Sequence, residues 1–336
     1  MTLWTELLET AVHAPSPHNV QPWRVRINSE TVAELLIEKR RTLPKEDVTG
    51  SFMILTMGLF IEALSILAAN RGYHLRHELL QQLSQFASQA IERTNSELLP
   101  FAKLYLEVDN KINGKVPESL FLTRRTSRIS LRPDPVPTKA VQALSSLASE
   151  FGQRYEQITD PQLIEKILDC DCEALFEDLN MPAYHDEIVE WFRFTDRSSR
   201  KNRDGLDYRC MNASRTSFWM IARLPQLLQF PLTRPLFKKA YRKQIGVVPT
   251  LGMFAGPFWE PENAFPTGRF LMRAWLELAR HDLFIHPYGN LVTNQRAATW
   301  LVNETGLEKV WLIFKIGYSN QPPKSYRRSV EEVLVV

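Results

Sequence analysis

The sequence contains few cysteines and none of the short motifs that mark several common enzyme classes. Three cysteines in 336 residues are too few for a disulfide framework, and they lack the paired Cys-x-x-Cys spacing of a zinc site. No Gly-x-Gly-x-x-Gly, Gly-x-x-x-x-Gly-Lys or Gly-x-Ser-x-Gly string occurs. Their absence argues against a Rossmann domain, a phosphate-loop NTPase and an α/β-hydrolase. The low cysteine content predicts a reducing, cytoplasmic location.

The chain also lacks a strong excess of either charge and has a single long apolar run. The formal net charge is +3, from 41 basic and 38 acidic residues, so nucleic acid is not expected as a partner. Basic clusters at 193–209 and 238–243 are interpreted as solvated helix faces. The first twelve residues lack the features of a signal peptide. The run 52–69 contains Glu62 at its middle, which favours a buried core helix over a membrane span, so no membrane partner is expected.

The spacing of apolar residues predicts an α+β chain in two halves. We expect helices over 3–13, 49–72, 138–151 and 267–283, and strands over 24–28, 32–38, 99–108, 247–254 and 310–317. A polar stretch over 110–117 marks the boundary between a first half, 1–115, and a second half, 116–336. A segment of about 181–246 has no counterpart in the first half. It predicts a helical insertion, which is either a lid or a peripheral elaboration.

The two halves carry an internal similarity. Gly58-Leu-Phe60 followed by Ala69 matches Gly268-Arg-Phe270 followed by Ala279 at one constant offset. The match predicts a duplicated half-domain. The alternative is a chance match between two helical segments of similar composition.

One loop stands out as a candidate binding element. It reads Ala14-Pro-Ser-Pro-His-Asn-Val-Gln-Pro-Trp23 and follows the first expected helix. Its prolines and asparagine fix a turning backbone, which leaves amides and the Ser16 and Asn19 side chains free to face a ligand. A purely structural loop can use the same residues.

Three strings taken together resemble the nitroreductase superfamily. The loop 14–23 matches Ala-Pro-Ser-x-x-Asn-x-Gln-Pro-Trp, and Arg124-Arg-Thr-Ser-Arg128 is similar to Arg-Arg-Ser-x-Arg. The segment 317–328 resembles a third motif, in which Gly, a Pro pair and Arg follow a terminal strand. The resemblance implies two nitroreductase-like α/β half-domains packed as a pseudo-dimer, with a helical insertion (lid) in the second, and FMN as cofactor.

The resemblance also implies a set of cofactor-binding residues. Planar guanidinium groups suit the FMN phosphate, and Arg128 is expected at the pyrimidine edge of the ring. The loop 286–290 corresponds to the family segment near flavin N5, although His286 could equally be a simple turn histidine. The expected cofactor-binding residues are Pro15, Ser16, Pro17, Asn19, Arg124, Arg125, Thr126, Arg128, His286, Pro287, Tyr288, Gly289, Arg327 and Arg328. No catalytic side chain is expected, because flavin N5 carries the chemistry.

Family members normally form homodimers that share two flavin sites. Here the first half has the loop and the second half has the arginines, so the halves are complementary and predict one composite site. A monomer therefore suffices, and a homodimer is the alternative. Pro17 departs from the family pattern, and a lid over the flavin would put NAD(P)H oxidation in doubt.

These observations predict an FMN-dependent oxidoreductase that passes hydride from NAD(P)H to a small-molecule acceptor. The alternatives are a protein that sequesters flavin without turnover and an enzyme whose substrate is FMN itself. Two histidine-containing strings, at 74–77 and 185–187, lack the further ligands of a metal site, so no metal is expected.

Overall fold

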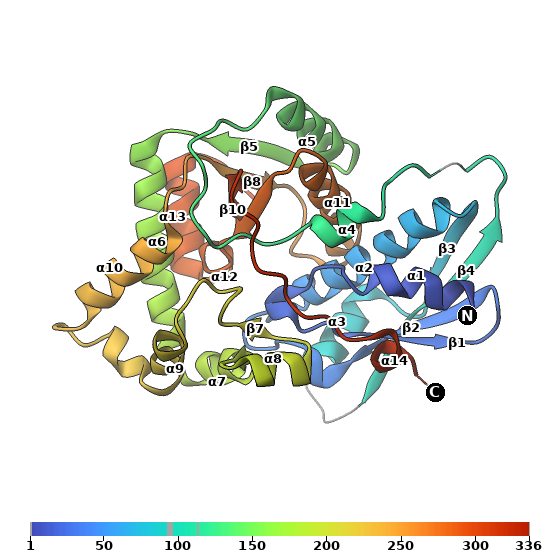
Figure 1. The fold of residues 1–336 in the computed structure, drawn as a ribbon, viewed down its shortest axis with the longest axis horizontal. Helices are drawn as coiled ribbons and strands as arrows, with labels where there is room; N and C mark the ends of the chain where they lie inside the picture. Colours follow the sequence, from blue (N-terminus) through green and yellow to red (C-terminus); the bar gives the residue numbers. More distant parts are fainter. Residues whose placement is uncertain (1, 93–96, 113, 336) are drawn as a thin grey trace. The chain divides into compact units, whose positions relative to one another are not determined.

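The computed structural model describes residues 2–92, 97–112 and 114–335. The chain divides into two compact units that interleave along the sequence (Figure 1). Unit 1 comprises Met1–Arg124, Phe258–Leu276 and Tyr326–Val336, and unit 2 comprises Arg125–Pro257 and Glu277–Ser325. Both units combine helices with an antiparallel sheet, so the α+β fold class is confirmed. The halves 1–115 and 116–336 remain a prediction about the repeat and do not describe the compact units.

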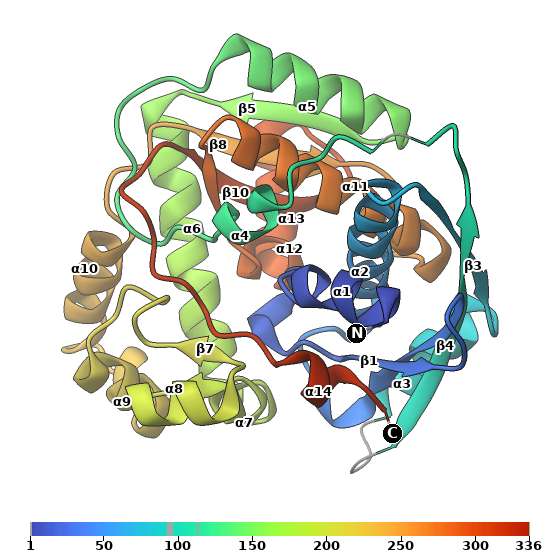
Figure 2. The same ribbon diagram turned by 45° about the vertical axis from the view of Figure 1, so that its right-hand side comes forward.

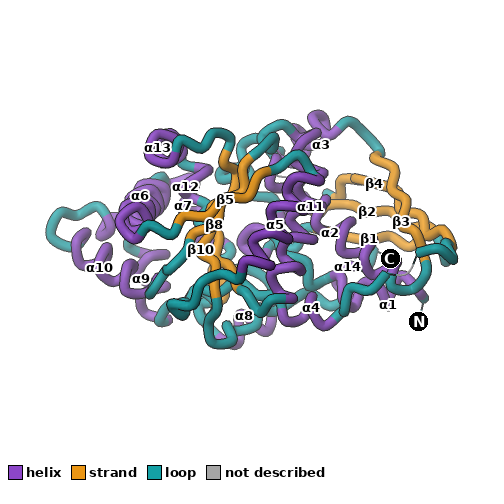
Figure 3. Tube along the Cα trace, turned by 90° about the horizontal axis from the view of Figure 1, so that it is seen from above, coloured by secondary structure: helices purple, strands orange, loops and turns teal. Residues whose placement is uncertain are grey.

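Unit 1 is built on a four-stranded antiparallel sheet in the order β1-β2-β4-β3 (Figure 3). Its strands are β1 (Trp23–Ile27), β2 (Val32–Glu38), β3 (Tyr73–Leu79) and β4 (Leu98–Val108). Its helical elements are α1 (Leu3–Ala11), η1 (Pro17–Asn19), η2 (Lys39–Arg41), α2 (Ser51–Ala69), α3 (Leu83–Ile91), α4 (Ser119–Thr123), most of α11 (Pro261–Arg280) and α14 (Val330–Val333). Figure 2 shows α14 beside β1, where the Val335 amide donates to the Val25 carbonyl at 2.8 Å.

The long apolar helix α2 lies inside unit 1. Its mean hydropathy is 2.1, high enough for a membrane span by composition, and 83% of that window is buried. A helix that is apolar on all sides is expected where protein surrounds it completely. The burial of α2 agrees with the core helix that the sequence predicted.

Unit 2 has a second four-stranded antiparallel sheet, in the order β5-β8-β10-β9. Its strands are β5 (Arg154–Ile158), β8 (Leu251–Ala255), β9 (Phe284–Pro287) and β10 (Val310–Gly317), and a small parallel pair is formed by β6 (Phe192–Arg193) and β7 (Leu206–Asp207). Its helices are α5 (Thr138–Glu150), α6 (Pro161–Leu179), α7 (Pro182–Glu190), α8 (Asp196–Asn202), α9 (Arg215–Arg223), η3 (Pro225–Leu228), α10 (Arg234–Ile245), α12 (Asn290–Thr293) and α13 (Gln295–Thr305).

The two sheets have the same topology. In each, the first two strands along the chain are neighbours, the fourth follows, and the third lies at the edge. A long helix links the second and third strands in both cases, namely α2 in the first sheet and α11 in the second. This agreement supports the duplication that the glycine motifs predicted.

The matching glycines also contact each other's helices within unit 1. A Cβ atom added to Gly58 would lie 2.3 Å from the Phe265 carbonyl oxygen, and one added to Gly268 would lie 2.1 Å from the Leu55 carbonyl oxygen. Since 268 − 58 and 265 − 55 both equal 210, the two contacts are reciprocal. Reciprocal contacts of this kind are the mark of a two-fold interface. The repeat therefore appears in the packing as well as in the residues.

Several expected boundaries differ in the structure. The helix expected over 267–283 begins at Pro261, since Pro266 forfeits only one hydrogen bond near the start of α11. The strand expected over 247–254 begins at Leu251. The expected insertion over 181–246 corresponds to the segment between β5 and β8. That segment starts earlier than expected, because it includes α6, which has no counterpart between β1 and β2. The segment is mostly helical.

Candidate functional site

The loop after α1 has a strained backbone. His18, Asn19 and Gln21 have φ values of 45°, 55° and 50°, in the left-handed region that residues other than glycine seldom adopt. Ser16 Oγ accepts a hydrogen bond from the Gln21 amide at 3.0 Å and so closes the loop. Pro15 and Pro17 flank Ser16, and their fixed φ angles restrict the backbone that leads into this loop. Strain of this kind persists only where surrounding contacts enforce it, and it often marks functional sites.

The C-terminal segment enforces this conformation. Arg327 Nη1 donates to Asn19 Oδ1 at 2.6 Å, and Asn19 Nδ2 donates to the Tyr326 carbonyl at 3.1 Å. The structure therefore brings together two predicted site residues that lie 308 positions apart. The Ser16 and Asn19 side chains both form hydrogen bonds within the protein, and their contact with a cofactor stays a prediction.

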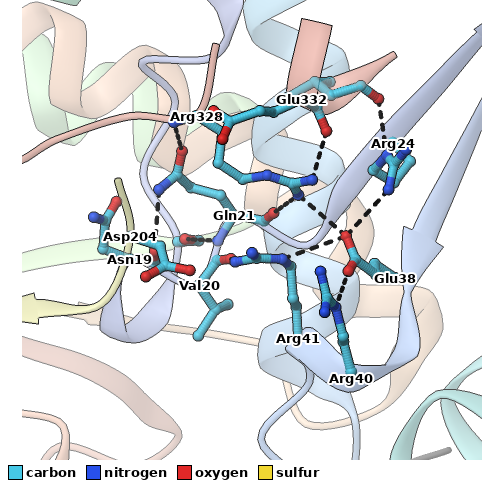
Figure 4. Close-up of polar contacts among 12 residues, drawn as sticks. Asn19, Val20, Gln21, Arg24, Glu38, Arg40, Arg41, Asp204, Arg328 and Glu332 are labelled. Atoms are coloured by element: carbon cyan, nitrogen blue, oxygen red, sulfur yellow. Dashed lines mark hydrogen bonds and ion pairs between the residues drawn. The ribbon is translucent and has the colours of Figure 1, made fainter. Parts of the chain in front are cut away.

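Arg328 holds the same segment from its other side (Figure 4). Its amide donates to Gln21 Oε1 at 2.8 Å, and its guanidinium lies 3.3 Å from Glu38 Oε2. Arg24 and Arg41 also pair with Glu38. Burial raises the pKa of Glu38, but the surrounding guanidiniums, Arg41 foremost, outweigh burial and hold it below its usual range. Arg328 therefore links the C-terminal segment to the β1–β2 hairpin through Gln21 and Glu38. Its role in cofactor binding stays a prediction.

Arg124 is a buried cation of unit 1. Its side chain is 6% exposed, its Nη2 donates to the His13 carbonyl at 2.9 Å, and its guanidinium lies 4.5 Å from the Trp275 ring centroid. Its Nε atom is buried and has no hydrogen-bond partner. No carboxylate in the described residues forms an ion pair with Arg124. Burial, and then the Arg327 guanidinium, lower the pKa of Arg124 to about 9, so the group is charged at neutral pH.

This arrangement is costly without an anion. A buried cation loses its hydration, and two like charges close together add repulsion. A bound phosphate would accept from the guanidinium donors and remove both costs. Of the predicted site residues, Pro15, Ser16, Pro17, Asn19, Arg124, Arg327 and Arg328 all belong to unit 1.

The other predicted residues lie in unit 2, where several hold the backbone in place. Arg125 Nη1 donates to the Pro322 carbonyl at 2.6 Å, and Thr126 forms a β-bridge with Ile285. Pro287 ends β9 and Tyr288 follows it, its amide bonded to the Ile313 carbonyl at 2.8 Å. Gly289 has φ −59°, which any residue adopts, so its backbone conformation does not require glycine.

Unit 2 contains a group of buried and partly buried polar side chains, two of them cationic, which we call the Arg128 cluster: Arg128, Lys315, His286 and Tyr288. Arg128 Nη1 donates to the Cys210 carbonyl at 3.2 Å, while its Nε atom is buried without a partner. Lys315 is fully buried, and its Nζ donates to two carbonyls at 2.8 and 2.9 Å. Burial, and then Arg128, lower the pKa of Lys315 to about 7.

The other two members of the Arg128 cluster are neutral and incompletely bonded. Burial, then Arg128 and Lys315, hold the pKa of His286 well below its usual value. Its Nδ1 atom and the Tyr288 hydroxyl are buried without hydrogen-bond partners. Polar atoms left unpaired in this way are uncommon in proteins and require an explanation, such as a ligand or water.

Sequence reasoning missed two buried ionisable residues of unit 2, Lys315 of this cluster and Asp171. Lys315 could have been found, since it is the only charged residue in the strand Val310–Gly317. Asp171 gives no such signal, because it lies among other acidic residues in α6. The Tyr241 hydroxyl donates to Asp171 at 2.7 Å, yet burial outweighs this bond and raises the pKa of Asp171 to about 7.

The described residues contain no group of three or more His, Cys, Asp or Glu side chains able to hold a metal ion. The three cysteines are free; Cys170 and Cys172 are buried, and Cys210 is partly exposed.

Comparison with known proteins finds no matching family model and no matching curated protein. Among solved structures, the chain is similar to the FMN-dependent nitroreductase NfnB from Mycobacterium smegmatis in complex with NADPH, at 19% identity and a TM-score of 0.36, over 62% of this chain and 93% of that one. It is also similar to iodotyrosine deiodinase bound to FMN and 3-iodo-L-tyrosine, at 17% identity and a TM-score of 0.32, with the same coverage. At these TM-scores the likeness carries no argument, so the function must be argued from the residues.

Proposed function

We propose that this protein is an FMN-dependent oxidoreductase of the nitroreductase type. The observation that carries the proposal is the convergence of Arg124, Arg327 and the strained loop in unit 1. The sequence predicted that this loop and these arginines, from opposite ends of the chain, would serve one cofactor. Their contacts in unit 1 support that prediction.

The residues of unit 1 fit the phosphate of FMN. Arg124 carries a buried positive charge, an unpaired Nε donor and no acidic partner among the described residues. A phosphate dianion would accept hydrogen bonds from Arg124 and lessen its repulsion with Arg327. Asn19 accepts from Arg327 and so fixes the direction of that guanidinium.

For the Arg128 cluster of unit 2 we propose a second role, which rests on its charge. When bound, FMN would supply the hydride chemistry at N5, accepting from NAD(P)H and passing electrons to a small acceptor. The motif position of Arg128 implies the pyrimidine edge of that flavin, where its charge would stabilise the reduced form. No side chain needs to act as a nucleophile.

The first experiment tests cofactor binding. The purified chain should bind FMN, and Arg124→Ala should raise the dissociation constant about 10- to 100-fold, the loss expected for one charge-assisted pair. Quenching of FMN fluorescence measures this. Arg76→Ala is the matched control, since Arg76 is an exposed cation of unit 1 paired with Glu107. A chain that rejects FMN would end the proposal.

The second experiment tests turnover. Mixing the FMN complex anaerobically with NADH or NADPH should bleach the yellow absorbance, and adding a nitroaromatic acceptor should restore it. Arg128→Met should lower the flavin midpoint potential with a smaller effect on FMN affinity, because its proposed role concerns the reduced state. A flavin that stays oxidised with both donors would point instead to sequestration. Fragmentation of FMN under oxygen would make the cofactor the substrate.

A further inference from the structure

The segment between β5 and β8 in unit 2 contains several exposed apolar side chains close together in the sequence. Five of the twelve exposed large apolar side chains in the described residues lie within 219–236. They are Trp219, Leu224, Phe230, Leu232 and Leu236, and we call this set the docking patch. Leu232 and Leu236 are the most exposed, at 79% and 68%. Soluble proteins seldom gather exposed apolar side chains in this way unless the surface has a partner.

The segment that carries the docking patch has charges of one sign only. No Asp or Glu occurs between residues 208 and 259, while the same stretch contains eight Lys and Arg residues. Arg234, Lys238 and Arg242 pair with acidic residues of α6. Arg223, Lys239 and Lys243 are exposed, and no described residue forms an ion pair with them. These three charges face solvent without compensation.

Helical spacing places the apolar and basic side chains together. In α9, Trp219 and Arg223 are four positions apart and both are exposed, while Phe218 and Ala222 on the other face belong to a buried core. Residues three and four apart share a helix face. α9 therefore exposes one apolar and one basic side chain, Trp219 and Arg223.

The second helix repeats this arrangement. In α10, Leu236, Lys239 and Lys243 share one exposed face, while Phe237 and Tyr241 pack into a core that also holds Leu228 of η3. Ile221 of α9 packs against this same core, so α9, η3 and α10 form one body. Figures 1 and 2 draw α9 and α10 at the margin of unit 2.

We propose that the docking patch binds the surface of an anionic lipid bilayer. Apolar side chains flanked by Lys and Arg are the features that let a helical segment lie in a membrane interface. The tryptophan and leucines would enter the acyl boundary, and Arg223, Lys239 and Lys243 would contact lipid phosphates. This attachment is peripheral, so it is consistent with α2 being a core helix. It revises the expectation of no membrane partner and the interpretation of 238–243 as a merely solvated face.

Charge argues against a second copy as the occupant. A two-fold dimer through this surface would place the basic cluster of one copy against that of the other, and like charges repel. An anionic bilayer would instead pair Arg223, Lys239 and Lys243 with negative charges, and its acyl region would bury the leucines.

The test is co-sedimentation of the full chain with vesicles. Vesicles of phosphatidylcholine with about one third phosphatidylglycerol should bind the protein, and pure phosphatidylcholine vesicles should bind far less. Raising the salt concentration to about 0.5 M should weaken binding, because the charges are then screened within a few ångströms. Equal binding to both vesicle types, or to neither, would overturn the proposal.

Two variants locate the binding surface. The triple variant Arg223→Gln/Lys239→Gln/Lys243→Gln should lower partitioning about 100-fold, at about fivefold for each charge near the membrane. Leu232→Ser/Leu236→Ser should lower it by a similar factor, since each leucine loses its burial.

Matched controls come from exposed positions elsewhere. Lys111→Gln/Lys115→Gln/Lys139→Gln removes the same charge, and Val48→Ser/Val108→Ser removes side chains that are 67% and 70% exposed. Both controls should bind anionic vesicles as the unmodified chain does. A loss of binding in the controls equal to that in the patch variants would overturn the proposal. So would a dimer that Leu232→Ser abolishes while vesicles fail to bind.

Discussion

The reciprocal glycine contact between α2 and α11 yields a quantitative prediction. The perturbation is Gly58→Ala, Gly268→Ala, or both. Each added methyl group would lie 2.1–2.3 Å from a backbone carbonyl oxygen, whereas ordinary contacts start near 3.4 Å. The neighbour is backbone in both cases, so it cannot turn away as a flexible side chain would. The helices must separate by about 1 Å at this point.

The cost follows from two opposing effects. Overpacking a tight contact costs about 1–3 kcal/mol. Alanine in a helix recovers about 0.5–1 kcal/mol relative to glycine. Each single variant should therefore lose about 1–2 kcal/mol of unfolding free energy. The double variant should lose less than the sum, because the first methyl group already opens the space that the second requires.

Equilibrium denaturation in urea measures these differences, with Ser65→Ala as a control in the same helix. Similar losses at the two glycines and a coupled double variant are expected from a two-fold contact. Stabilisation by either alanine, or strict additivity of the pair, would refute the reasoning about reciprocal packing.

Two further predictions concern buried carboxylates. Burial raises the pKa of Asp171 to about 7, so the folded state holds a proton that the unfolded state has released. The contribution of Asp171 to the unfolding free energy should therefore fall by about 1.4 kcal/mol per pH unit as pH rises from about 4 to about 7. Urea denaturation of the parent and of Asp171→Asn should differ by that slope across this range. Glu38→Gln should lower the unfolding free energy by about 3 kcal/mol at neutral pH, because it leaves buried guanidiniums unpaired. The pKa of Glu38 lies below its usual range, so the difference from the parent should shrink as pH falls through that pKa. Glu34→Gln breaks only a more exposed pair with Arg26 and should cost less than about 1 kcal/mol; equal losses would contradict this account of Glu38.

Local sequence features determined much of this protein. Alternation and helical spacing predicted the strands 32–38 and 310–317 at their observed bounds and the core helix of unit 1 nearly so. The element predictions succeeded because periodic apolar residues fix an element's type through its immediate neighbours. The glycine repeat predicted a duplication, which the matching strand order of the two sheets supports.

Tertiary structure alone decided how the site residues are used. Asn19 and Arg327 meet across 308 positions, and no local pattern in the sequence predicts this hydrogen bond. Lys315 and Asp171 acquire their shifted pKa values only from burial among distant segments. Hydrogen bonding and desolvation depend on which residues, distant in sequence, pack against a side chain. A local sequence pattern does not specify those residues. The motifs therefore named the residues, while long-range packing assigned their contacts.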